Sequence, residues 1–154
     1  MDNAETLVSS SFLRETFSDS MDYAEMVLNK EIVDSEVINY QLEDIDFYKN
    51  ELVLGYILCQ EDLTNTIYSF IDNSNSMFIP VDELYEAFEK AFNITDEKIT
   101  IYLEAQEEKG VMPLRVIFGD TGDSMDVAMY GASLFRAAVV KNVTEILVKK
   151  MMED

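Results

Sequence analysis

The longest regular pattern in the chain is residues 122–152, GDSMDVAMYGASLFRAAVVKNVTEILVKKMM. Apolar side chains recur there every three or four residues, which is the spacing of one face of an α-helix. Gly131 interrupts this face although glycine costs a helix about 1 kcal/mol relative to alanine. We therefore predict a long amphipathic C-terminal helix with close helix packing or a kink at Gly131. Its apolar stripe consists of Met125, Ala128, Met129, Ala132, Phe135, Val139, Val143, Ile146 and Leu147.

Three further segments have helical spacing and are predicted to be helices. These are residues 11–30, residues 62–71 and residues 81–92, where Leu84, Ala87 and Phe88 fall on one face. Pro80 directly precedes the third segment, a position where a missing backbone N–H costs little.

Between these helices the apolar residues follow strand patterns. Alternation predicts strands at 37–42, extended by Ile45 and Phe47, and at 99–103 and 114–118, while the apolar run 51–59 suggests a mostly buried strand. Residues 107–110 are expected to connect the last two strands, with Gly110 at positive φ. The predicted fold class is α+β, a single domain over 1–154 with a small, mainly antiparallel sheet of about four strands packed with helices. The pattern allows a flexible segment over about the first ten residues.

Composition excludes several classes of function. The 154 residues include 31 acidic and 11 basic side chains and no histidine, for a net charge of −20. Every mechanism that needs an imidazole is therefore excluded, and the phosphates of nucleic acid would repel the chain. Cys59 is the one cysteine and lies in an apolar run, so we expect a buried thiol and no intramolecular disulfide.

The same features predict a cytoplasmic protein without a membrane partner. The acidic N-terminus shows no signal-peptide pattern, and the longest apolar stretch, Leu52 to Cys59, is too short to span a bilayer. No phosphate-binding glycine-rich loop or nucleophile motif occurs, so we expect neither an enzyme nor a cofactor.

The negative charge is densest in residues 31–72, where ten acidic side chains accompany Lys49 alone, a net of −9. A net charge of about 2 to 8 is enough to keep a small domain soluble, so −20 points to a use beyond solubility. Complementary charge steers association, so we expect a basic protein partner. An even distribution of acids that serves solubility is the alternative.

The leading hypothesis is an acidic inhibitor that occupies the basic nucleic-acid-binding site of a partner such as a nuclease. Proteins of this kind include phage inhibitors of host defence and immunity proteins against nuclease toxins, and the analogy is one of composition only. Acidic side chains would steer the encounter and tyrosines would anchor it. The predicted partner-binding residues are Glu36, Tyr40, Glu43, Asp44, Asp46, Tyr48, Glu51, Glu61 and Asp62.

Residues 72–83, between two predicted helices, resemble a degenerate EF-hand loop. Asp72, Ser74, Ser76 and Glu83 fall at loop positions one, three, five and twelve, whereas Met77 replaces the usual glycine. A calcium-binding module is therefore one alternative function. Asp120, Asp123 and Asp126 could also hold Mg²⁺, but acids at a helix start explain them without a metal.

Another alternative is an oligomeric assembly or chaperone-like subunit, as in a virion. The methionines of the C-terminal helix, Met125, Met129, Met151 and Met152, would then pack against a second copy. Packing of this stripe within its own chain is the simpler expectation.

Overall fold

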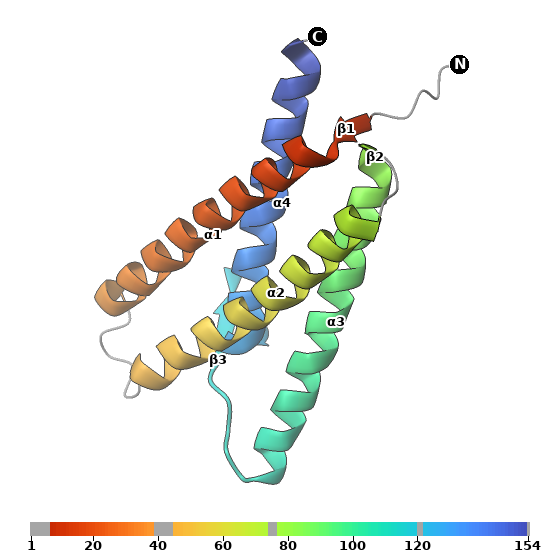
Figure 1. Ribbon diagram of the computed structural model, residues 1–154. Helices are drawn as coiled ribbons and strands as arrows, with labels where there is room; N and C mark the ends of the chain where they lie inside the picture. The colour runs from red at the N-terminus through yellow and green to blue at the C-terminus, as the bar shows by residue number, and fades with distance from the viewer. Residues whose placement is uncertain (1–6, 39–44, 74–76, 120–121, 154) are drawn as a thin grey trace.

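Four long helices dominate the computed structural model, which describes residues 7–38, 45–73, 77–119 and 122–153. Two small two-stranded sheets accompany them within these residues (Figure 1). The elements in chain order are β1 (Leu7–Ser9), α1 (Ser10–Ile38), α2 (Ile45–Asn73), β2 (Phe78–Pro80), α3 (Val81–Glu108), β3 (Arg115–Phe118), β4 (Asp123–Asp126) and α4 (Val127–Glu153).

The helix α4 is the centre of the bundle. Helices α1 and α2 run in opposite directions in front of it in Figure 1, and α4 packs against both. Helix α3 lies at the edge, packs mainly on α2 and makes few contacts with α4. The buried side of α4 carries Ala128, Ala132, Phe135, Val139, Val143 and Leu147, spaced three or four residues apart as predicted.

Two glycines set the distance between α2 and α4. A Cβ atom on Gly131 would lie 2.0 Å from the carbonyl oxygen of Leu52, and one on Gly55 would lie 1.6 Å from that of Ala128. Only a residue without a side chain can occupy such a contact. The predicted close packing at Gly131 is therefore confirmed, and α4 is one continuous helix there.

The two sheets connect helices rather than form a layer. Antiparallel strands β1 and β2 pair Val8 with Ile79, both buried, and place the start of α1 beside the start of α3. Strands β3 and β4 form a hairpin in which Arg115 pairs with Asp126 and also forms a 3.2 Å ion pair with it. This hairpin leads directly into α4.

The predicted α+β fold with a sheet of about four strands is wrong. Residues 51–59 lie inside α2, residues 99–103 lie inside α3, and Ile45 and Phe47 begin α2. Of the segment 37–42, Val37 and Ile38 end α1, and the other residues lie outside the described part of the chain. Only 114–118 is confirmed as a strand, and its partner is β4 rather than 99–103.

The burial of individual side chains explains why alternating apolar residues led to an incorrect prediction of strands. Within 51–59 the apolar run conceals a helical face, because Leu52, Tyr56 and Cys59 are buried while Ile57 is 41% exposed. In α3, Ile99 is buried but Ile101 is 59% exposed. A few β-branched residues at alternate positions are thus compatible with a helix when only one of them faces the core.

The predicted hairpin connection at 107–110 is instead the C-terminal end of α3. Gly110 has a φ of 76°, and its N–H donates to the carbonyl of Glu107 at 3.0 Å. The N–H of Val111 donates to the carbonyl of Gln106 at 2.9 Å. Glycine in the left-handed conformation commonly ends a helix in this way. The positive φ of Gly110 is therefore confirmed, although its structural role differs.

All four predicted helices are present, but their limits differ. Helix α1 extends the prediction for 11–30, α2 contains 62–71, and α3 continues the predicted 81–92 as far as Glu108. Helix α4 begins at Val127, so Asp123 and Asp126 belong to β4, and Asp126 is the residue that directly precedes the helix. No helix among the described residues is long and apolar enough to cross a membrane.

Replacing Gly131 with alanine tests the α2–α4 contact. An alanine normally stabilises a helix interior by about 1 kcal/mol relative to glycine. Here the added methyl group meets the α2 backbone, so we expect the free energy of unfolding to fall by about 1–3 kcal/mol or more. Urea denaturation of the wild type and Gly131→Ala measures the difference.

Ala137→Gly, on the exposed side of α4, is the control, and helix propensity alone should lower its stability by about 1 kcal/mol. A Gly131→Ala protein that is more stable than the wild type would contradict the close contact.

Candidate functional site

Three of the residues predicted to bind a partner are buried. Tyr48 is 6% exposed, Glu51 is 4% exposed and Asp62 is 6% exposed, all on the inner side of α2. A side chain in this position cannot contact a partner without rearrangement of the fold. These residues contribute to the structure of the bundle instead.

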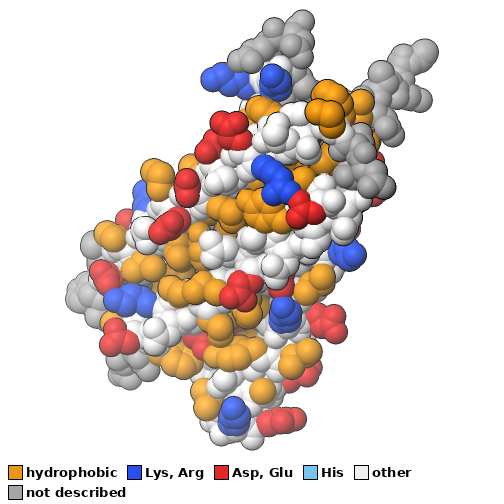
Figure 2. All heavy atoms as spheres, viewed as in Figure 1, with side chains coloured by type: hydrophobic (Ala, Val, Ile, Leu, Met, Phe, Trp, Pro, Cys, Tyr) orange, Lys and Arg blue, Asp and Glu red, His pale blue; other side chains and the backbone are white. Residues whose placement is uncertain are grey.

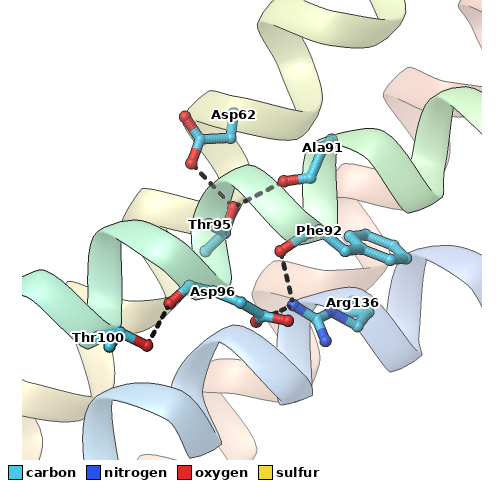
Figure 3. Close-up of polar contacts among 7 residues, drawn as sticks. All are labelled: Asp62, Ala91, Phe92, Thr95, Asp96, Thr100 and Arg136. Carbon is cyan, nitrogen blue, oxygen red and sulfur yellow. Dashed lines mark hydrogen bonds and ion pairs between the residues drawn. The ribbon is translucent and has the colours of Figure 1, made fainter.

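The side chain of Asp62 on α2 links this helix to α3. Its carboxylate accepts a 2.8 Å hydrogen bond from the hydroxyl of Thr95 of α3 (Figure 3). It also forms an ion pair with Lys98 of the same helix. On the other side of α3, Arg136 of α4 forms a 2.7 Å ion pair with Asp96 and contacts the Phe92 ring. A buried carboxylate needs such partners to offset its loss of water.

Glu51 is held in a similar way by the hydroxyl of Tyr102, which donates to its Oε1 atom. Burial and the nearby carboxylate raise the pKa of Tyr102 to about 12, so the phenol stays protonated and can donate. The Tyr130 hydroxyl donates to Glu31 at 2.8 Å, and the pKa of Tyr130 is also raised, first by burial. Tyrosines therefore pair with acids inside the fold rather than only at its surface.

Of the remaining predicted residues, the three that the structure describes are exposed. Glu36 is exposed and forms a 2.6 Å ion pair with Lys49, while Asp46 and Glu61 are exposed. Tyr40, Glu43 and Asp44 lie outside the described residues, so their contribution stays a prediction.

Charge is also mixed on the face shown in Figure 2. Acidic side chains lie there singly among Lys and Arg, and apolar surface runs between the helices. Two acids form ion pairs with bases of α1, Asp72 with Arg14 near the start of this helix and Asp34 with Lys30 near its end. This view shows no continuous acidic band.

A larger set of exposed carboxylates lies on the solvent side of α3. The buried side of this helix carries Leu84, Phe88, Ala91, Thr95 and Ile99, and the exposed acids recur on the opposite side with helical spacing. We call this surface the α3 acidic face, and it consists of Asp82, Glu83, Glu86, Glu89, Glu97, Glu104, Glu107 and Glu108, all exposed.

Few bases compensate this face. Lys98 is paired with Asp62, which leaves Lys90 and Lys109 as the other bases of this segment. At 1.5 Å per residue, Asp82 and Glu108 are about 39 Å apart along the helix axis. The face therefore has about one carboxylate per 5 Å, compared with one phosphate per 3.4 Å in a DNA strand.

Sequence reasoning missed the α3 acidic face for two reasons. The acids of α3 are interrupted by lysines, so a count of net charge along the chain ranked 31–72 higher. The strand predicted at 99–103 also divided the helix between Glu97 and Glu104. A helical wheel drawn through Glu108 would have placed both acids on the same side.

The residues proposed for calcium are not gathered in the described part of the chain. Asp72 is at the end of α2 and pairs with Arg14, while Glu83 is exposed in the first turn of α3. Ser74 and Ser76 lie outside the described residues, as does Asp120 of the magnesium hypothesis, so both loops stay predictions. Among the described residues, no three His, Cys, Asp or Glu side chains lie close enough to hold a metal ion.

Cys59 is a free, buried thiol, as predicted. Burial raises its pKa to about 11, which keeps it protonated and unreactive at neutral pH. The methionines of α4 differ in exposure: Met129 is half-buried within the chain, and Met152 is 82% exposed. Most of the predicted apolar stripe thus packs inside its own chain, and assembly through α4 stays a prediction.

Comparison with known proteins adds no relative. The chain matches no family model, no curated protein and no solved structure. Inference about its function therefore depends on the geometry and charge described above.

Asp62 and its neighbour Glu61 provide a matched test of the buried contact. Asp62→Ala removes the acceptor for Thr95 and the partner of Lys98, so we expect the free energy of unfolding to fall by about 1–3 kcal/mol. Glu61→Ala removes the same charge from the surface and should change it by about 0.5 kcal/mol or less. Chemical denaturation measures both variants, and equal effects would contradict a structural role for Asp62.

The buried phenol of Tyr56 should make the free energy of unfolding fall at high pH. Its hydroxyl is buried without a hydrogen-bond partner among the described residues, and its ring meets Phe135 edge-on at 5.0 Å between centroids. Burial first, and then the Glu25 and Asp22 carboxylates, raise its pKa from 10.0 to about 12. The folded state therefore holds this proton more tightly than the unfolded state.

The contribution of the Tyr56 proton to the free energy of unfolding is complete below pH 10 and is lost as the pH rises to about 12. Denaturation between pH 9 and 12, with tyrosinate absorbance as a second signal, should show a smaller decline for Tyr56→Phe than for the wild type. Tyr23→Phe is the control, and a decline unchanged by Tyr56→Phe would refute this role.

Proposed function

We propose that the protein is a non-enzymatic inhibitor that binds a basic, nucleic-acid-acting protein through the α3 acidic face. Eight exposed carboxylates on one side of a peripheral helix are the observation that supports this function. A positive nucleic-acid-binding site attracts such a surface as it attracts phosphates. The bound inhibitor would keep nucleic acid out of the site.

The size of the α3 acidic face supports the same proposal. Its length of about 39 Å is close to one turn of duplex DNA, which is about 34–36 Å. A cleft built for one turn of duplex could therefore meet carboxylates along its whole length. Because its charge density is lower than that of DNA, association through this face should weaken as salt rises, but less steeply than the binding of DNA to the same site.

The position of α3 also favours binding without a change of fold. The helix rests on α2 through its buried side and is held by the Asp62 and Arg136 contacts. Its acids are therefore displayed on a preorganised scaffold, which reduces the entropy lost on association.

Neutral variants of equal charge separate this surface from the total charge. The α3 variant carries Glu89→Gln, Glu97→Gln, Glu104→Gln and Glu107→Gln, and the α1 control carries Glu15→Gln, Asp19→Asn, Asp22→Asn and Glu25→Gln. Each immobilised protein is incubated with lysate at low salt, and captured proteins are identified by mass spectrometry. Duplex DNA is then added as a competitor.

We expect the wild type and the α1 control to capture a basic nucleic-acid-binding protein that duplex DNA releases. The α3 variant should bind that protein about tenfold or more weakly, since exposed ion pairs contribute about 0.2–1 kcal/mol each. Equal losses in the two variants, or a partner that duplex DNA does not displace, would contradict the proposal.

A further inference from the structure

A groove lies between α2 and α3, beside the α3 acidic face. It has a volume of about 570 Å³, and we call it the α2–α3 groove. Its apolar lining includes Phe70 of α2 together with Ala87 and Ile94 of α3, and Ile94 is 37% exposed. Glu83 and Glu86, which belong to the α3 acidic face, also line it.

The groove continues toward the β1–β2 sheet. An adjoining hollow of about 630 Å³ shares Phe70 and Glu83 with it and adds the side chains of Leu7 and Phe78. These two apolar residues are 52% and 53% exposed. Apolar surface thus extends from Ile94 past Glu83 to the end of the bundle, with carboxylates along one side.

We propose that the α2–α3 groove binds a basic amphipathic helix of the partner, with apolar side chains in the groove and Lys or Arg side chains at Glu83 and Glu86. This inference rests on the proposed function, because it assigns the groove to the same basic partner. Charge complementarity selects the occupant, since two carboxylates and the adjoining α3 acidic face would repel an acidic segment.

The dimensions favour a helix. Glu83 and Ile94 are separated by eleven positions, or about 16 Å along α3, which is about three turns. A helix in an apolar groove presents side chains at positions i, i+4, i+7 and i+11, and these four positions cover about the same length. Lys90 lies between these two ends, so the basic side chains of the partner should gather toward Glu83 rather than Ile94.

Apolar contact supplies what the acidic face lacks. Exposed ion pairs are screened when salt reduces the Debye length to about 3 Å at 1 M, whereas burial of apolar surface is not weakened in this way. The groove should therefore give the complex selectivity that persists at high salt. It would distinguish one basic partner from other positively charged proteins.

Two fluorescein-labelled 18-residue peptides of leucine, lysine and alanine test the groove. They share one composition, but only one is amphipathic as a helix. Fluorescence anisotropy at about 1 M salt should show the full-length protein binding the amphipathic peptide about tenfold more tightly than the scrambled one. Methyl NMR signals of Ala87 and Ile94 should shift on binding.

Ser69→Tyr fills the groove from α2, and Ser18→Tyr adds the same ring to the exposed side of α1 as a control. We expect Ser69→Tyr to abolish the preference for the amphipathic peptide and Ser18→Tyr to preserve it. Ile94→Gln removes apolar lining without adding charge and should also reduce the preference. This second variant keeps the test valid if the Ser69→Tyr protein does not fold.

Equal affinity for both peptides, or a preference that survives both groove variants, would overturn this inference. Methyl shifts that depend on protein concentration without peptide would show a second copy in the groove and would also overturn it. At low salt, the α3 variant with four neutralised glutamates should bind both peptides more weakly by the same factor. The ratio of the two affinities should therefore stay unchanged. Failure of the groove can therefore be distinguished from failure of the α3 acidic face.

Discussion

The contact between α2 and α4 determines the arrangement of the whole bundle. At Gly55 and Gly131 each helix lies so close to the other that a Cβ atom would meet a backbone carbonyl. This proximity lets α4 bury its alanines and aromatics against α2 and α1 at once. Because α4 fills the centre, α3 is left at the edge, where only one of its sides is buried.

The position of α3 at the edge of the bundle allows its acidic side chains to stay in contact with water. A helix buried on one side can carry acids on the other without desolvating them, and α3 does so along most of its length. The acids of α2 are in a different situation, since Glu51 and Asp62 face neighbouring helices and need Tyr102, Thr95 and Lys98 as partners. Acidic residues thus stabilise the interior of the fold as well as forming its outer surface.

The helices were predictable from sequence where one apolar face was isolated by polar residues. Residues 81–92 have this pattern, whereas 122–152 were predictable from the length over which apolar residues recur every three or four positions, and Gly131 indicated the close contact of α4 with α2. Residues 51–59 were not predictable in the same way, because a helix that meets neighbours on several sides has apolar residues nearly all around it. Residues 99–103 were assigned to a strand for another reason, because a buried Ile99 and an exposed Ile101 have the alternate spacing of a strand although both lie in a helix.

The candidate surface was less predictable than the fold. Counting charge along the chain identified 31–72, but the count cannot distinguish Glu61, which is exposed, from Asp62, which is buried. Which acids share a surface depends on helix limits and on packing, and both depend on long-range contacts. The acids of α3 share one surface because the helix continues to Glu108, through the segment predicted as a strand at 99–103.

We propose that the α3 acidic face, rather than the total charge of the protein, mediates binding. Carboxylate footprinting tests this most directly, by labelling exposed Asp and Glu side chains with an amine and carbodiimide in the free protein and in its complex. Glu89, Glu97 and Glu104 should be protected in the complex while Glu15, Asp19 and Asp22 of α1 are labelled as before. Protection spread evenly over both helices, or confined to α1, would contradict it.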